Sequence, residues 1–209
     1  SELAKSGVGT ITLIDSDVLK PENTYRHILG SFGVDHPKVD ALKKDIDSKY
    51  PYTFIIAKNS SVENIIEENM NIFNSENLII IATGNPTINF MLNNFFIKHT
   101  KRIPVIYTWV DPYGIGGHAL LTNNQEKNGC YQCIYEMDFE LGLYNRASFA
   151  ARGQFFSKTI TGCSSLFVPY SSLDALQTSV IATRLAIDVL KGAELDNPII
   201  SWRGSCDEF

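Results

Sequence analysis

Two hydrophobic patterns alternate along the chain from its beginning to its end. Short continuous apolar runs are typical of strands buried on both faces, and they occupy residues 10–14, 52–57, 78–82, 103–107 and 199–202. Apolar residues three and four positions apart predict amphipathic helices, at residues 39–49, 89–98 and 173–190, with one more helix beginning at Ser61. Strands that alternate with helices predict an α/β fold with a doubly wound, mostly parallel sheet. Such sheets bind ligands at the carboxyl ends of their strands.

Three stretches interrupt this alternation. Residues 114–117 break the pattern with glycines, residues 123–129 form a polar loop, and residues 139–161 have no clean period and predict a crossing loop with some helix. The first nine residues have the pattern of a last helical turn stopped by glycine that continues directly into a strand. We therefore expect a fragment that lacks the first strand and helix of its fold.

Composition excludes several classes of protein. A chain of 209 residues with 44% hydrophobic residues predicts one domain with a normal core. A formal net charge of -5 argues against a nucleic-acid binder. No apolar run reaches the roughly 18 residues that a membrane span needs, and we expect no signal peptide. With four cysteines and no export signal, a reducing, cytoplasmic location is expected.

Polar residues that suit a nucleotide follow the first predicted strand. Asp15 ends this strand, Asp17 follows it, and Asn23, Arg26 and Lys38 come next along the chain. An acidic residue at a strand end of a dinucleotide-type fold accepts bonds from ribose hydroxyls, and cations suit a triphosphate. In isolation, Asp15 is better explained as a residue that ends the strand and caps the turn.

Taken as an ordered set, these stretches resemble the ThiF, MoeB and ubiquitin-activating families. The set comprises Leu3–Asp17 with its L-A-x-x-G-V-G entry and D-x-D end, then Asn23–His27, then Pro37–Val39. The resemblance implies a Rossmann-like adenylating domain over residues 1–209, with residues 139–165 as its crossover loop. It also implies ATP and Mg²⁺ as cofactors, with Asp15 on the ribose and Asn23, Arg26 and Lys38 around the phosphates. Asp17 is a further expected cofactor-binding residue.

The chain departs from the family pattern at three places. His27 stands where the family has glutamine, and Gly84 stands in Thr83-Gly84-Asn85 where the family has a Mg²⁺-binding aspartate. Asp17 and Asp111 are the alternative metal-binding carboxylates. The family's glycine-rich phosphate loop is expected before Ser1, so we expect the fragment itself to bind ATP poorly and to be inactive.

Cys163 lies before Pro169 and the long helix of residues 173–190. On composition alone a small buried residue is as good an explanation. By position it resembles the family's crossover-loop cysteine, which implies a nucleophile that takes an adenylated carboxyl-terminal glycine as a thioester.

Cys130 and Cys133 are two residues apart, and such thiolates can hold one edge of a tetrahedral Zn²⁺. Cys206 is the remaining cysteine available to the site, with His118 or Asp207 as a poor fourth ligand. Two inert thiols are the alternative interpretation.

The glycines of residues 109–120 would allow close approach of a partner's extended tail, and the alternative is a turn with a satisfied His118. The G-G-H-A-L run of this segment, together with Arg26-His27 and the strand end Ala82–Asn85, most resembles bacterial fusions of a conjugating and an activating domain, some of which act in anti-phage operons. We therefore expect adenylation of the carboxyl terminus of a ubiquitin-like or other small protein with a glycine tail, by a homodimer. The alternatives are a sulfur-carrier adenylyltransferase and a non-catalytic scaffold.

Overall fold

The structure is a computed structural model that describes residues 1–99, 102–124, 129–154, 158–159, 166–167, 169–193 and 196–205. The chain forms two compact units, residues Ser1–Phe73 and Asn74–Phe209. Strands and helices alternate in both, so the prediction of an α/β fold is confirmed. Among the described residues no helix is long and apolar enough to cross a membrane.

The first unit is built on a parallel pair of strands, in which Thr10 of β1 lies opposite Phe54 of β2. Its core contains Ala4, Ile46 and Ile55, which come from a helix, a second helix and a strand. Its elements are α1 (Glu2–Lys5), β1 (Thr10–Ile14), η1 (Pro21–Asn23), η2 (Gly30–Gly33), α2 (Lys38–Lys49), β2 (Phe54–Lys58), α3 (Val62–Glu68) and η3 (Ile72–Ser75), the last reaching the unit boundary. The predicted strands and helices of this unit therefore form close to their expected bounds.

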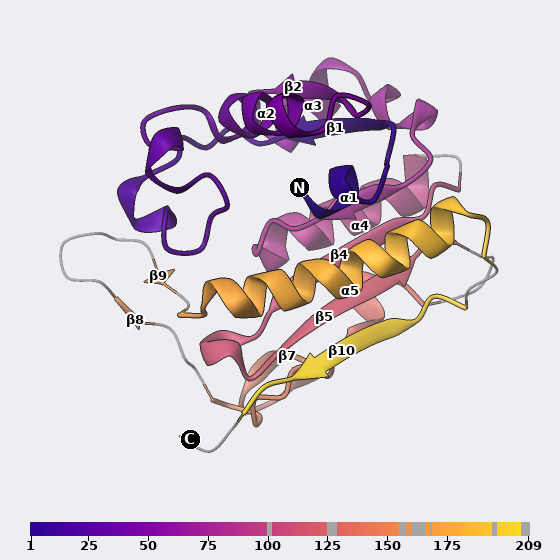
Figure 1. Ribbon diagram of the computed structural model, residues 1–209. Coiled ribbons are helices and arrows are strands. Elements are labelled where there is room, and N and C mark those ends of the chain that lie inside the picture. The colour runs from indigo at the N-terminus through magenta and orange to yellow at the C-terminus, as the bar shows by residue number, and fades with distance from the viewer. Residues whose placement is uncertain are drawn as a thin grey trace. The chain divides into compact units, whose positions relative to one another are not determined.

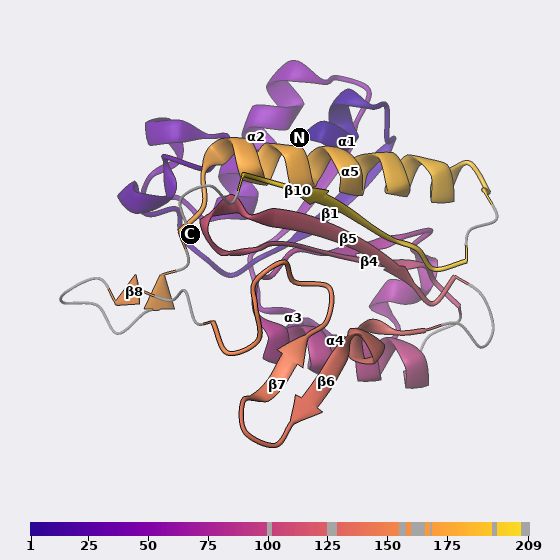
Figure 2. The same cartoon turned by 90° about the horizontal axis from the view of Figure 1, so that it is seen from below.

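The second unit contains a four-stranded sheet in the order β10-β5-β4-β3. Strand β3 pairs in parallel with β4, whereas β5 and β10 extend the sheet in antiparallel fashion. Helix α5 covers one face of this sheet, and α4 lies on the opposite face (Figures 1 and 2). The bounds are β3 (Ile79–Ile81), α4 (Pro86–His99), β4 (Val105–Val110), η4 (Pro112–Gly114), β5 (Gly116–Thr122), η5 (Tyr131–Ile134), α5 (Ser172–Leu190) and β10 (Ile199–Arg203).

Strand β5 is the main correction to the sequence prediction. The glycine break was expected over residues 114–117, but the turn ends earlier and all seven residues of β5 are buried. Tyr113 and Gly114 make the turn with positive φ angles of 58° and 67°. A Cβ on Gly117 would lie 2.1 Å from Thr178 Oγ1 of α5. The glycines therefore permit tight packing of the sheet against α5, which a search for apolar runs does not detect.

The predicted crossing loop begins in a hairpin. Strands β6 (Tyr135–Asp138) and β7 (Gly142–Asn145) pair in antiparallel fashion and project from the unit on the side of α4 (Figure 2). Two short strands, β8 (Lys158–Thr159) and β9 (Leu166–Phe167), also pair with each other. Strand β8 lies within the predicted loop and β9 follows it. The described part of residues 139–161 thus contains strands where some helix was expected.

Candidate functional site

The carboxyl end of β1 carries the acidic residues that the sequence singled out. The Asp15 side chain accepts a hydrogen bond from the Asp17 backbone N–H, at 2.8 Å. Asp17 in turn forms an ion pair with Lys38, with 2.6 Å between Oδ2 and Nζ. The Asp17 side chain is 66% exposed and that of Lys38 is 21% exposed. A pair this exposed contributes only about 0–1 kcal/mol to stability, so Lys38 can exchange Asp17 for another anion at little cost.

Backbone contacts bring the start of α2 to the same place. The Lys38 N–H donates to the Asp17 carbonyl oxygen at 2.9 Å, and Val18 forms an isolated antiparallel bridge with Pro37. Lys38 is also the first residue of α2, whose N–H groups favour anions. The structure therefore brings Asp15, Asp17 and Lys38 together at the end of β1.

Asn23 and Arg26 lie on the turn that connects these two elements. The Asn23 side-chain oxygen accepts the Lys20 N–H at 3.0 Å, and its carbonyl oxygen accepts the N–H groups of Arg26 and His27. Burial lowers the pKa of His27, and the Lys38 cation lowers it further, while the Asp15 carboxylate acts in the opposite direction. His27 is therefore held in its neutral form beside these charges.

In the second unit, the carboxyl end of β3 continues into a turn that begins α4. Gly84 has a φ of 65° and no atom near the position of an added Cβ. The Asn85 side chain accepts the N–H groups of Thr87 at 3.0 Å and Ile88 at 3.4 Å. Asn85 therefore caps the helix, and Gly84 offers no side chain to a metal ion.

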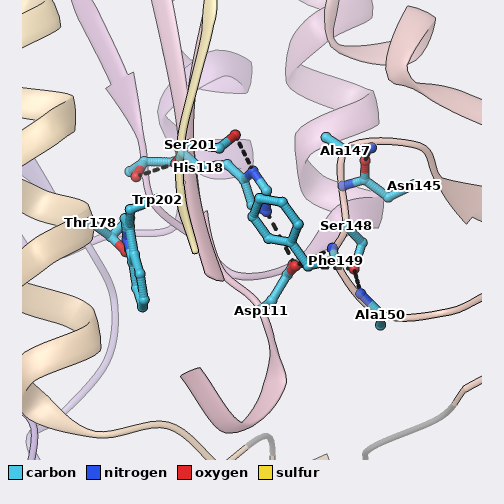
Figure 3. Close-up of polar contacts among 11 residues, drawn as sticks. Asp111, His118, Asn145, Ala147, Ser148, Phe149, Ala150, Thr178, Ser201 and Trp202 are labelled. Carbon is cyan, nitrogen blue, oxygen red and sulfur yellow. Dashed lines mark hydrogen bonds and ion pairs between the residues drawn. The ribbon is translucent and has the colours of Figure 1, made fainter. Parts of the chain in front are cut away.

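A buried polar cluster lies after β4 (Figure 3). Asp111 Oδ2 accepts hydrogen bonds from the Phe149 N–H at 2.9 Å, Ser148 Oγ at 3.1 Å and His118 Nε2 at 3.2 Å. The other ring nitrogen of His118 bonds to Ser201 Oγ at 2.7 Å. His118 is fully buried and Asp111 is 3% exposed. Burying a carboxylate is costly unless donors surround it, and these three donors meet that requirement.

The strand register explains the contact between His118 and Ser201. Backbone hydrogen bonds join Leu121 to Pro198 and Gly204 to Ile115. In an antiparallel pair of strands, hydrogen-bonded and non-hydrogen-bonded residue pairs alternate. Counted along the register from either of these bonded pairs, the opposed residues His118 and Ser201 form a non-hydrogen-bonded pair. The side chains of such a pair lie closest together. His118 is satisfied, as one of the two interpretations of this segment predicted.

Two predictions for this region lose support. Asp111 was an alternative metal ligand, but its carboxylate is buried and already accepts three hydrogen bonds. The glycines of β5 were expected to leave room for a partner's tail, but the space over Gly117 is filled by Thr178 and Trp202, and the space over Gly116 by Phe149. Both features serve the packing of this unit.

Cys130 immediately precedes η5 and Cys133 lies within it, and their sulfurs lie 3.6 Å apart. Cys133 Sγ accepts the Cys130 N–H at 3.4 Å, and Cys130 Sγ accepts the Asn93 side-chain amide at 3.6 Å. Burial raises the pKa of the Cys130 thiol, but the bonds from Asn93, Cys133 and the backbone outweigh it, so the pKa lies below its usual value. Cys163 and Cys206 lie outside the described residues.

Sequence reasoning missed the polar contacts behind this thiol pair. Asn89 and Asn93, one turn apart on α4, are 3% and 2% exposed. Thr83 Oγ1 donates to Asn89 Oδ1 at 2.7 Å, and the Asn89 amide donates to the Tyr131 hydroxyl at 3.2 Å. Two asparagines four residues apart on the predicted helix of residues 89–98, Asn89 and Asn93, were the available signal.

The alternation of strands and helices in both units defines a Rossmann-like α/β domain. The chain belongs to the ThiF family, whose model matches residues 1–193.

Two relatives match almost the whole chain. The uncharacterized protein y4qC of Sinorhizobium fredii is 25% identical over 206 residues, 92% of this chain and 34% of the relative. The ATP-dependent ubiquitin transferase-like protein Cap2 of Pseudomonas aeruginosa is 26% identical over 202 residues, 91% of this chain and 33% of the relative. The adenylyltransferase and sulfurtransferase UBA4 of Scheffersomyces stipitis is 25% identical over 136 residues, 64% of this chain and 29% of the relative. This chain thus spans about a third of their length.

Two solved structures share the fold. The crystal structure of PaaA superposes with a TM-score of 0.69 at 18% identity, and covers 100% of this chain and 56% of its own. The crystal structure of E. coli MccB with ATP superposes with a TM-score of 0.63 at 15% identity, and covers 97% of this chain and 58% of its own. At these identities the likeness establishes the Rossmann-like fold.

Proposed function

We propose that the protein of which this chain is part uses ATP to adenylate the carboxyl terminus of a ubiquitin-like or other small protein. The observation that carries the proposal is the Asp17–Lys38 ion pair beside Asp15 at the end of β1, in a chain of the ThiF family. The names of two relatives, an ATP-dependent ubiquitin transferase-like protein and an adenylyltransferase, support it.

The proposed chemistry needs charge more than a strong base. A carboxylate of the partner attacks the α-phosphorus of ATP, a bond forms between them, and pyrophosphate leaves with the electrons of the broken P–O bond. Arg26 and Lys38 would neutralise the phosphates, Asn23 would donate to them, and Asp15 would accept the ribose hydroxyls. Because the Asp17–Lys38 pair is exposed, a phosphate can replace Asp17 as the partner of Lys38.

Mg²⁺ is part of this proposal. It prefers oxygen ligands and usually keeps several waters. Asp17 fits better than Asp111, because its carboxylate is exposed whereas Asp111 is buried under three donors. Asp17 would hold the ion near the phosphates, where the ion would offset their charge.

ATP–pyrophosphate exchange by the full-length protein tests adenylation. Lys38→Ala should lower kcat/KM for exchange by about 100-fold or more, the scale for losing one preorganised cation. Lys49→Ala is a matched control, because Lys49 lies on the same helix and also pairs with an aspartate, Asp45, at 2.6 Å. Equal losses in the two variants, or a full-length protein without exchange activity, would reject the assignment and favour the scaffold alternative that Gly84 suggests.

We further propose that Cys163 receives the acyl group. Its thiolate would attack the acyl carbon of the mixed anhydride, a C–S bond would form, and AMP would leave. Cys163→Ala in the full-length protein should leave exchange intact and abolish a thiol-sensitive adduct with the partner. An adduct that survives this substitution contradicts the role, and one that never forms favours the sulfur-carrier alternative.

Zinc at Cys130 and Cys133 is a separate proposal. Zn–S bonds of about 2.3 Å place two tetrahedral thiolates about 3.8 Å apart, close to the observed 3.6 Å. The described residues contain no group of three or more metal-binding side chains, so further ligands would come from elsewhere, with Cys206 as the predicted one. Zinc would fix this turn as a structural ion. Metal analysis of purified protein tests the proposal, and protein without zinc rejects it.

The remaining expectations concern the whole protein. We propose a cytoplasmic homodimer, which size-exclusion chromatography with light scattering tests directly. An anti-phage role is supported by the sequence resemblance alone, and unchanged phage plating after deletion of the gene would reject it.

A further inference from the structure

A continuous series of hydrogen bonds connects the thiol pair with the carboxyl end of β3, within the second unit. Asn93 donates to Cys130 Sγ and accepts the Tyr131 N–H at 3.0 Å. The Tyr131 hydroxyl accepts from Asn89, and Asn89 accepts from Thr83 Oγ1. Asn89, Asn93 and Tyr131 are together called the amide ladder below.

The amide ladder is buried, and each of its side-chain amides is hydrogen-bonded through both its oxygen and its nitrogen. Its three residues are 2–3% exposed, and the oxygen and the nitrogen of both asparagines are bonded. Buried polar groups are strongly destabilising when they lose a partner. Within these three buried residues a lost hydrogen bond is not replaced by water, so a shift of one residue favours movement of the next.

Tyr131 is held rigidly in the middle of this series. Its ring stacks on Tyr107 at a centroid distance of 4.4 Å and meets Phe90 edge-on at 5.5 Å. Tyr131 also follows Cys130 directly in the chain, so a rearrangement of the turn that holds the sulfurs moves this ring. Packed cores respond to such shifts in discrete steps rather than by smooth deformation.

The other end of the ladder is the turn that begins α4. Thr83 Oγ1, which donates to Asn89, also accepts the Asn85 N–H at 3.1 Å. Asn85 caps the helix through Thr87. The position of Thr83 thus sets both the turn at Gly84 and the cap of the helix that follows.

We propose that Cys130 and Cys133 form a control site, whose chemical state is transmitted through the amide ladder to the Thr83–Asn85 turn. Cys133 is exposed and Cys130 is partly exposed, so reagents in solution reach the pair. The turn follows the carboxyl end of β3, and α/β sheets bind ligands at the carboxyl ends of their strands. An effect on ATP affinity is therefore expected, and this part of the proposal rests on the proposed function.

Hydrogen exchange of the Asn85 amide tests the coupling without a nucleotide. The probe is N-ethylmaleimide, applied to the chain after zinc chelation, with Cys163→Ala and Cys206→Ala so that the thiol pair alone reacts. Alkylation should speed exchange of this amide by about fivefold or more, the lower range of couplings between sites. Unchanged exchange after complete alkylation, or thiols that do not react, would overturn the proposal.

Two variants on α4 separate transmission from a general loosening. Asn93→Ala removes the link to Cys130 and should abolish the response to alkylation. Asn94→Ala, at the exposed neighbouring position, should keep the full response. Asn89→Ser interrupts the ladder one helical turn earlier and should also abolish the response. Either ladder variant alone decides the test if its circular dichroism spectrum matches that of the parent. An equal response in a ladder variant and in Asn94→Ala would contradict transmission through the ladder.

The same alkylation applied to the full-length protein addresses function. Alkylation is expected to weaken ATP binding. The same weakening is expected in Asn94→Ala, whereas alkylation of Asn93→Ala should leave ATP binding unchanged. A full-length protein that binds no ATP rejects the proposed function, while the amide-exchange result still decides the coupling.

Discussion

His27 is a residue whose charge state the fold controls. Burial and the Lys38 cation lower its pKa, with Asp15 opposing them. A histidine whose folded pKa is depressed contributes stability that is complete above its unfolded pKa of about 6.5 and is lost as the pH falls through the folded value. The urea midpoint of the protein should therefore fall between pH 7.5 and pH 5, and His27→Gln should reduce this fall. A fall of the same size in the parent and in His27→Gln would disprove the interpretation.

Gly117 is a residue at which one methyl group is too large. An added Cβ would lie 2.1 Å from Thr178 Oγ1 and 2.4 Å from Trp202 Nε1, which are themselves hydrogen-bonded at 2.8 Å. Gly117→Ala should therefore lower the free energy of unfolding by about 1–3 kcal/mol, the usual cost of overpacking. Gly9→Ala adds a methyl group in open space and should change stability by less than about 0.5 kcal/mol. Denaturant titration of both variants checks the contrast, which fails if Gly117→Ala is as stable as the parent.

At the scale of elements, helix α5 depends on the capping box at its start. Ser171 Oγ accepts the Asp174 N–H at 3.3 Å, and Asp174 Oδ2 accepts the Ser171 N–H at 2.7 Å. Ser171→Ala should cost about 1 kcal/mol, measured as a lower thermal midpoint. Ser179→Ala removes a hydroxyl that bonds only within the helix, to the Leu176 carbonyl oxygen, and should have little effect. Similar midpoints for the two variants would mean that the cap does not stabilise α5.

Elements with a clear hydrophobic period were predictable from the sequence, and those defined by contact were not. The runs that became β1 and β3 and the period of α5 gave strands and a helix close to their observed bounds. Strand β5 was missed because its glycines, chosen for close packing, have the local signature of a turn. The hairpin of β6 and β7 was missed because it has exposed apolar residues, such as Met137 and Leu143, on a surface that shows no alternation.

The candidate site divides in the same way. Asp15, Asp17 and Lys38 were grouped through their resemblance to the ThiF family, and the structure places their side chains near one another. The contact of His118 with Ser201 joins positions 83 residues apart, and no local pattern encodes such a register. The amide ladder also depends on how α4 lies against η5, which the sequence of either segment alone does not specify.

At the scale of the whole molecule, each compact unit has its own core, and this predicts where a core defect is felt. Ile46 is 1% exposed in the first unit, and Leu121 is fully buried in the second. Either residue changed to alanine should lose about 2–5 kcal/mol through lost burial and a cavity. Because units with separate cores open separately, Ile46→Ala should speed hydrogen exchange mainly in residues 1–73 and Leu121→Ala mainly in residues 74–205. Mass spectrometry of peptides resolves the two regions, and equal acceleration across both in either variant would show instead that the units unfold as a single cooperative body.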